Sequence, residues 1–457
     1  MLHVTRLFAS GLLLTGLVAS ASATGALPAP NLAAFPEIPA AVKGVKIVRI
    51  ADHGAFHRYF DVSPISPSGR YVALLRVPYE NKHAQPGDAA NVIIVDLQTG
   101  KERTVATSRA WGHQLGANVQ WGVSDHELYF NDVDPADWSC FAIQLDPSSG
   151  ARRKLGGTVF SVSPDGRQLA SDNQTKTSRY VQEGYGAALP KEFSKPNVGL
   201  VDDDGLYLTD VATGKSRLLL STRQIYEQTV PSIRIANPEA YEYYCFVVKW
   251  NAQGTRLLIT FQWSPLAGDK AKRRRSVITM RPDGSEIRTA VTPEQWARRG
   301  HHVNWAPDGE HLTMNLEVDG QPGLEIVKFR PDGTGMEIIH PLGSGHPSIN
   351  PHHPFMITDA YPWEPFAVGD GSSPLRLIDL RTKEEVVIAN IAIGLEKGSG
   401  LRVDPHPAWD ASGRYIVFDG FEGGTRNVYL ADLGAILSGE QKVDWAKREI
   451  PPPKQQP

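Results

Sequence analysis

The sequence predicts an all-β protein that folds as one seven-bladed β-propeller. Two observations predict this fold: a short motif recurs seven times, and a second strand-like run that ends in a turn signal follows it within the unit. A unit of about 40 to 60 residues with four strands is typical of a propeller blade. The coils of a β-solenoid, which is the rival fold, are much shorter than these units.

The recurring motif is an apolar or aromatic anchor residue, two or three small or polar residues, a glycine and then a β-rich run. "WAPDGEHLTMN" and "WDASGRYIVFD" are clear copies, and two others are looser. Neighbouring anchors are 41 to 60 residues apart, except for one gap of 88 residues. In chain order the anchors are Ile65, Trp121, Val162, Trp250, Trp305, Ile349 and Trp409.

The second run of a unit, as in "NVIIVDLQTGK", ends in a Thr-Gly or Asp-Gly turn signal, which predicts antiparallel strands. The C-terminal unit is one strand short, so we expect Gly44–Ile50 to pair with it and close the ring. The long gap contains two inserts, 173–203 and 221–242, which we expect to be long loops over one face. Almost no helix is expected outside these inserts and the N-terminal signal segment.

The N-terminal segment has the pattern of a secretory signal peptide: a basic start, an apolar run and the small residues Ala21–Ala23. We expect residues 1–23 to be the signal peptide, 24–43 a linker, 44–440 the propeller and 441–457 a C-terminal tail. No later apolar stretch approaches the roughly 20 residues that span a bilayer. The protein is therefore expected to be secreted or periplasmic, without a membrane span.

Composition excludes several classes of partner and reaction. The 47 basic and 50 acidic residues nearly balance, so charge points to neither nucleic acid nor an anionic membrane. Cys140 and Cys245 are far apart, which excludes a disulfide scaffold and favours buried free thiols. There is no Gly-rich phosphate loop, and the propeller leaves no room for the hydrolase domain of peptidase propellers.

Three histidines occupy one repeat position. The residue three before each anchor should lie near the start of the innermost strand, where the blades meet at the axis; in order these residues are Val62, Asn118, Val159, Val247, His302, His346 and His406. Three convergent imidazoles predict a divalent metal site, for Mn, Zn or Ca, with Asp404 or Cys245 as a further ligand. The alternative is that these histidines only line the channel and bind water.

Several segments together resemble a known group of enzymes: "WGHQLGANVQW", "FSVSPDG", "HHVNW", "GHPSINP" and "DPHPAW". The chain is similar to secreted seven-bladed propeller lyases that cleave uronic-acid polysaccharides, namely oligogalacturonate lyases and, closer in motif order, ulvan and rhamnose-glucuronate lyases. The resemblance implies a metal at His302, His346 and His406 and an acidic oligo- or polysaccharide as substrate. Close relatives have a catalytic His where this chain has Leu115, a Tyr where it has Phe160 and an Arg where it has Lys176. His113 lies two positions from Leu115.

β-Elimination beside a uronate needs a cation for the carboxylate, a base for the adjacent proton and an acid for the departing oxygen. We expect His113, Tyr185, Lys176 and Arg179 to carry these roles. The alternative for His113 is a buried, hydrogen-bonded histidine without a catalytic role. Lys270–Arg275, "KAKRRR", is a solvated turn or, second, a uronate-capturing loop. The sequence predicts a metal-dependent polysaccharide lyase; the alternative is a non-catalytic periplasmic binding scaffold.

Overall fold

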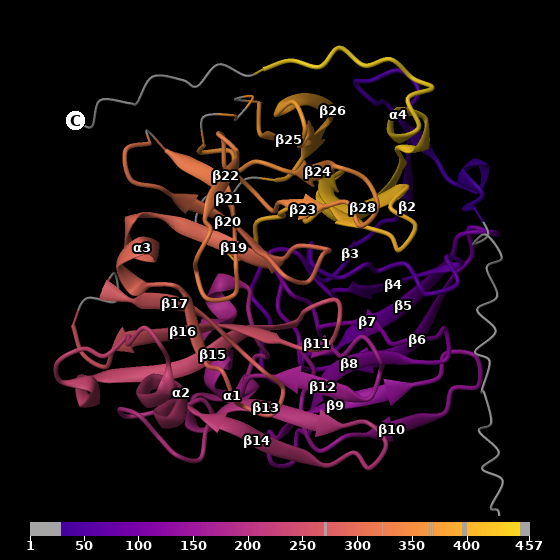
Figure 1. Cartoon of the computed structure of the whole chain (residues 1–457). Coiled ribbons are helices and arrows are strands. Elements are labelled where there is room, and N and C mark those ends of the chain that lie inside the picture. Colours follow the sequence, from indigo (N-terminus) through magenta and orange to yellow (C-terminus); the bar gives the residue numbers. More distant parts are fainter. Residues whose placement is uncertain are drawn as a thin grey trace, which may run out of the picture.

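Seven antiparallel sheets follow one another around a central axis in the computed structural model (Figure 1). The structure describes residues 29–268, 272–321, 323–364, 366, 368, 370–394 and 400–447. Blades 1 to 6 each contain four strands, and blade 7 contains five. The predicted seven-bladed propeller is confirmed.

The strands of blades 1 to 3 are β3 (Ala55–Phe56), β4 (Tyr71–Arg76), β5 (Ala90–Asp96), β6 (Glu102–Ser108); β7 (Gln120–Trp121), β8 (Leu128–Val133), β9 (Cys140–Leu145), β10 (Arg152–Lys154); β11 (Ser161–Val162), β12 (Gln168–Ser171), β13 (Gly205–Asp210) and β14 (Ser216–Ser221). Those of blades 4 and 5 are β15 (Tyr241–Trp250), β16 (Leu257–Pro265), β17 (Arg274–Met280), β18 (Arg288–Val291); β19 (Gly300–Trp305), β20 (Leu312–Glu317), β21 (Leu324–Phe329) and β22 (Glu337–His340). Blades 6 and 7 contain β23 (Ser348–Ile349), β24 (Phe355–Thr358), β25 (Ser372–Asp379), β26 (Glu384–Ala392); β27 (Ala408–Trp409), β28 (Tyr415–Glu422), β29 (Thr425–Asp432), β2 (Lys46–Ala51) and β1 (Glu37–Ile38).

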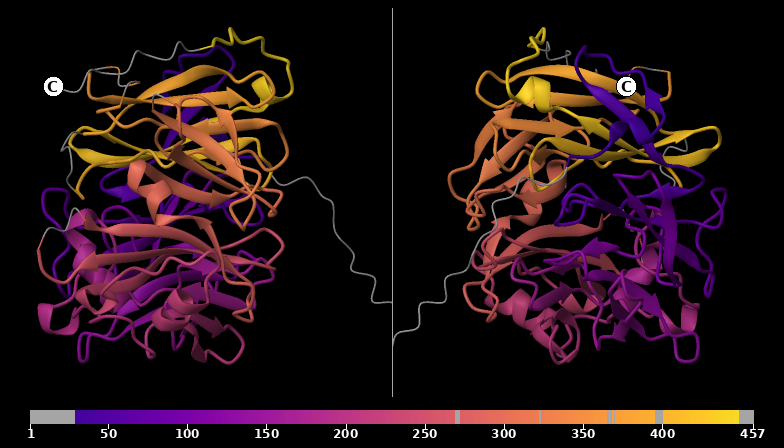
Figure 2. Two further views of the ribbon diagram at one scale, coloured as in Figure 1. Left: turned by 60° about the vertical axis from the view of Figure 1, so that its left-hand side comes forward. Right: turned by 90° about the vertical axis from the view of Figure 1, so that its right-hand side faces the viewer.

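Blade 7 closes the ring with strands from both ends of the chain. β2 pairs antiparallel with β29, and β1 adds a fifth strand outside β2. Figure 2 shows the indigo N-terminal segment against the yellow C-terminal strands. The predicted pairing of Gly44–Ile50 with the last blade is confirmed for its strand residues, and the expected linker contributes β1.

The core lies between neighbouring sheets. Leu75 and Val92 of blade 1, for example, pack in one cluster with Phe130 and Leu145 of blade 2. Three of the four tryptophan anchors add a hydrogen bond across the same interface, which satisfies the buried indole N–H; the indole nitrogen of the fourth, Trp250, has no partner among the described residues. The indole nitrogens of Trp121, Trp305 and Trp409 donate to the backbone oxygens of Pro64, Lys249 and Ser348 in the preceding blades.

Blade 1 departs from the repeat. Six inner strands end at or next to their predicted anchor, but β3 ends at Phe56, and Ile65 makes only an isolated bridge to Val72. The intervening residues 57–63, which we call the hub loop, leave the sheet and contact residues near the axis. Phe60 of this loop is 1% exposed.

Helices are short. α1 (Gln174–Thr177), η2 (Ser178–Glu183), η3 (Lys191–Phe193), α2 (Thr222–Gln228) and η4 (Pro238–Ala240) lie in the two inserts, whereas η1 (Leu32–Ala34), α3 (Pro293–Arg298) and α4 (Gly434–Leu437) lie outside them. Within the described ranges, no helix is both long and apolar enough to cross a membrane. The expected signal peptide lies outside the described residues, as do the start of the linker and the end of the C-terminal tail.

Candidate active site

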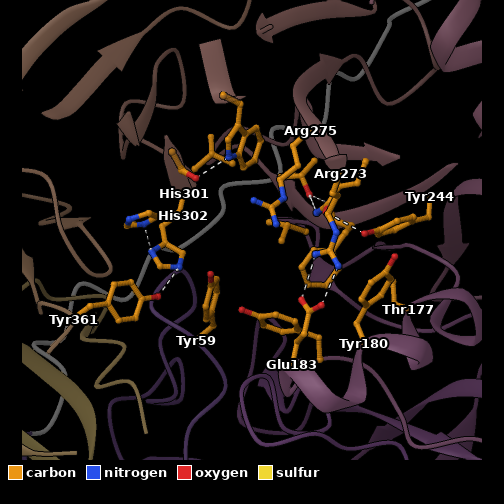
Figure 3. A pocket seen from close by; sticks show the side chains of 18 of the residues that line it. Tyr59, Thr177, Tyr180, Glu183, Tyr244, Arg273, Arg275, His301, His302 and Tyr361 are labelled. Carbon is orange, nitrogen blue, oxygen red and sulfur yellow. Dashed lines mark hydrogen bonds and ion pairs between the residues drawn. The ribbon is translucent and has the colours of Figure 1, made fainter. Parts of the chain in front are cut away.

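One cavity of about 340 Å³ opens beside the hub loop (Figure 3). Its walls come from the insert after β12, from β15 to β17, from α3 and β19, and from the segments around Tyr361 and Arg402. Tyr59 of the hub loop and His302 of β19 complete the lining. A concave site with aromatic walls and a few charged groups is typical of ligand binding.

The three predicted histidines lie together next to this cavity. The ring centroids of His302 and His346 are 3.9 Å apart, and those of His346 and His406 are 4.2 Å apart. His302 and His406 have positive φ values, as do Asn118 and Val247 at the equivalent repeat position. At His302 and Val247 this conformation coincides with a β-bulge, a device that re-aims a side chain.

His346, Asp404 and His406 form the candidate metal group, because their ligand atoms all lie within 4.8 Å of one another. Nδ1 of His346 donates to the Asp359 carboxylate at 2.9 Å, which leaves the Nε2 lone pair free. Nδ1 of His406 is buried and has no hydrogen-bond partner among the described residues. Burial, and then the neighbouring imidazole of His346, lower the pKa of His406 well below its ordinary value. Two imidazoles and a carboxylate fit a divalent metal, and they suit Mn or Zn better than Ca.

His302 lies outside that group. Its Nδ1 donates to the backbone oxygen of Gly345 at 2.6 Å, and its Nε2 accepts from the Tyr361 hydroxyl at 3.3 Å. Burial lowers the pKa of His302 well below its ordinary value, and the charges of neighbouring histidines add to this shift. Its role as a metal ligand stays a prediction, and its geometry places it in the cavity wall.

The two suggested further ligands differ in their surroundings. Asp404 belongs to the metal group, and its carboxylate also pairs with the Arg402 guanidinium at 2.9 Å. Cys245 is instead buried in an apolar cluster between blades 3 and 4, where burial raises the pKa of its thiol well above the ordinary value. Both cysteines are free thiols; Cys140 is half-buried rather than buried.

Three tyrosines surround Arg402 in the cavity. Tyr59, Tyr185 and Tyr361 all line it, and Figure 3 shows Tyr59 and Tyr361 on the side of His302. Burial raises the pKa of each phenol, while the charge of Arg402 acts in the opposite direction. The phenols are therefore protonated at neutral pH and available as proton donors.

Arg275 is the cation that projects into the cavity without a carboxylate partner (Figure 3). Arg273, two residues earlier, pairs with Glu183 at 2.9 Å. No carboxylate of the described residues lies within ion-pair distance of Arg275, whose guanidinium carbon lies 6.0 Å from the centroid of the Trp296 ring. Because a half-buried guanidinium favours an anion, the site is suited to a carboxylate-bearing ligand.

Of the four predicted catalytic residues, only Tyr185 lines this cavity. Lys176 donates to the backbone oxygen of Lys195, and Arg179 pairs with Glu242, so both secure the insert. His113 is 3% exposed and lies against Trp111.

Burial, and then the charge of Arg426, lower the pKa of His113 to about 3. The alternative reading of His113 as a buried, hydrogen-bonded histidine agrees with the structure in burial, but its Nε2 has no hydrogen-bond partner among the described residues. Its catalytic role stays a prediction without geometric support. The departures Leu115 and Phe160 are buried in the apolar core, and Phe160 lies under the Arg58 guanidinium at 4.7 Å.

Sequence reasoning missed Arg402, Tyr59 and Tyr361, and it ranked the uronate-capture reading of the arginine run second. The signal for Arg275 was present in that run, whose last two residues, Arg274 and Arg275, begin β17. The beginning of the run, Lys270 and Ala271, lies outside the described residues.

No family model matches the chain, and no curated protein matches it. Among solved structures, it is similar to an oligogalacturonate lyase in complex with manganese, with a TM-score of 0.55, 15% identity, and coverage of 88% of this chain and 97% of that one. An oligogalacturonate lyase from Vibrio parahaemolyticus gives a TM-score of 0.57 and 13% identity at the same coverage. At these identities the likeness shows the propeller fold, and the chemistry has to be argued from the cavity.

Proposed function

We propose that this chain is an exported, metal-dependent lyase that cleaves uronic-acid-containing glycans by β-elimination. The observation that carries the proposal is the unpaired guanidinium of Arg275 in one cavity with His302 and protonated tyrosines. The fold shared with oligogalacturonate lyases, one of them a manganese complex, supports the same reading. The resemblance to ulvan and rhamnose-glucuronate lyases stays a sequence-based prediction.

The residues divide the reaction into three tasks. Arg275 pairs with the uronate carboxylate, which acidifies the hydrogen on the adjacent carbon. The lone pair on Nε2 of His302 accepts a hydrogen bond from the Tyr361 hydroxyl. In the reaction this hydrogen bond is broken, and Nε2 takes the proton from the substrate carbon. The Tyr185 phenol donates its proton to the glycosidic oxygen as that bond breaks, so the products are an unsaturated uronate and a free hydroxyl.

His346, His406 and Asp404 would hold the metal beside this centre. A divalent ion there supplies positive charge that stabilises the anion formed next to the carboxylate. Asp359 orients His346 for ligation.

Purified protein incubated with pectic, ulvan, glucuronan and gum-arabic oligosaccharides tests the proposal. We expect a new ultraviolet absorbance from the conjugated double bond, and a mass spectrum in which one product is lighter by one water than a hydrolysis product. A mock preparation from cells that do not express the protein controls for contaminating enzymes. Saturated products would refute elimination, and no cleavage of any uronate polymer would favour the binding scaffold.

A further inference from the structure

We propose that a second cavity beside the candidate active site is a subsite for a further anionic residue of the same glycan, which is therefore bound as an extended polyanion. The second cavity has a volume of about 400 Å³. Arg275, Trp296, Tyr361 and Trp363 line both cavities, so the two are neighbours, and together they are called the groove. The identity of the ligand as a glycan rests on the proposed function.

Arginines dominate the second cavity. Five arginines line it, and Glu364 is the single carboxylate among its described lining residues. Glu364 accepts a hydrogen bond from the Ser344 hydroxyl and so already has a partner. Arg298 pairs with Asp319, but the Asp319 side chain is 82% exposed and the pair is therefore weak.

Arg274 and Arg299 carry the free charge of this subsite. In the described ranges of the chain, neither has a carboxylate within ion-pair distance, although both line the cavity. They come from different elements, β17 and the end of α3, that meet at the groove. Unpaired guanidinium groups at such a concave site favour carboxylate or sulfate groups over neutral ligands.

Trp363 gives the groove a flat surface for a sugar ring. Its side chain is 38% exposed, which is unusual for an indole, and it stacks on Tyr361 with ring centroids 4.7 Å apart and planes 11° apart. Because Tyr361 and Trp363 line both cavities, the indole lies at their junction. An exposed aromatic ring in the wall of an arginine-lined cavity suits a chain of anionic sugars.

The test compares the double variant Arg274→Ala/Arg299→Ala with Arg217→Ala, which removes an exposed arginine of β14 on another blade. Binding of tetragalacturonate and digalacturonate is measured by calorimetry with a chelator present to limit turnover. We expect the double variant to bind tetragalacturonate about tenfold or more weakly, on the scale of a lost charged hydrogen bond, and to bind digalacturonate as the wild type does. Arg217→Ala should match the wild type for both lengths.

The outcomes separate this subsite from the proposed function. If the wild type cleaves uronate glycans but the double variant binds both lengths normally, the subsite is refuted and the lyase stands. If the wild type cleaves none yet binds tetragalacturonate through these arginines, the subsite stands and the lyase fails. Equal binding of a neutral tetrasaccharide or a DNA oligonucleotide, or no binding of tetragalacturonate at all, overturns the subsite.

Discussion

Arg275 shows how one residue decides the chemistry of the cavity. Its neighbour Arg273 is neutralised by Glu183, whereas Arg275 is half-buried and keeps its charge for a ligand. Replacement of Arg275 by Ala should lower kcat/KM on the cleaved glycan by about 10²-fold or more, the scale for losing a preorganised electrostatic contact. Arg275→Lys should recover part of the loss, because charge remains but the planar fork does not. Equal activity of Arg275→Ala and wild type would show that the carboxylate binds elsewhere.

Asp359 is predicted to act on the metal through His346. Asp359→Asn should weaken metal affinity by about 10- to 100-fold, because the carboxylate fixes the tautomer and raises the basicity of the imidazole. Titration of chelator-stripped protein with Mn²⁺ or Zn²⁺ measures the change. His126→Ala, which removes an exposed histidine, serves as the control and should bind metal normally. Unchanged affinity in Asp359→Asn would show that the Asp359 charge does not tune metal binding.

Glu325 makes stability depend on pH. Burial raises the pKa of its carboxyl to about 7, and its Oε2 has no partner among the described residues. From about pH 4.5, the ordinary pKa, to about pH 7, the folded state keeps a proton that the unfolded state has lost, so the free energy of unfolding falls as pH rises. Glu325→Gln should therefore have a higher Tm than wild type above pH 7 and a similar Tm near pH 4.5. Melting curves across this range check it; parallel curves would contradict it.

At the scale of elements, the first insert, residues 173–203, forms a wall of the cavity because side-chain contacts hold it against blade 4. Glu242 of β15 pairs with Arg179 and accepts from the Tyr180 hydroxyl at 3.0 Å. Tyr185, the proposed proton donor, lies in the same insert. The predicted catalytic residue Arg179 thus has a positioning role in this structure.

Glu242→Ala should loosen the insert, because it removes the ion-pair partner of Arg179 and the hydrogen-bond acceptor of the Tyr180 hydroxyl. We expect faster cleavage by protease within residues 173–203 and a drop in kcat/KM of about tenfold, with the metal affinity unchanged. Glu239→Ala, which removes an exposed carboxylate just before β15, is the matched control. Wild-type protease resistance in Glu242→Ala would show that other contacts hold the insert.

The sequence predicts those residues that lie at a fixed distance from the anchor in each repeat. The equivalence of His302 and His406 followed from their distance to a tryptophan anchor, and the shared backbone conformation bears it out. The hub loop was not predictable, because eight residues separate the end of β3 at Phe56 from the anchor Ile65 and break that register. Arg402 and Tyr361 were missed because they lie in connections, which meet in space without any period in the sequence.

At the scale of the whole molecule, closure of the ring joins residues almost the full chain length apart. Ile47 and Val48 of β2 are fully buried against blade 7 and its neighbours. A chain that begins at residue 52 leaves β29 with an unpaired edge, so it should aggregate and lose a cooperative melting transition. A chain that begins at residue 29 should melt as the full chain does. Circular dichroism and size-exclusion chromatography compare the two, and equal melting temperatures would refute the closure argument.

The hub loop of blade 1 contacts all six of the other blades. Arg58 donates to Asn118 of blade 2 and covers Phe160 of blade 3, and Asp61 pairs with Lys249 of blade 4 at 3.0 Å. The aromatic pair that follows Arg58 packs on His302, His346 and His406 of blades 5, 6 and 7. In stacked repeat proteins each unit contacts only its neighbours, and stability is roughly a sum of neighbour terms. Here one loop contacts residues of all six other blades, so a change within residues 57–63 acts directly on every blade and not only on adjacent ones.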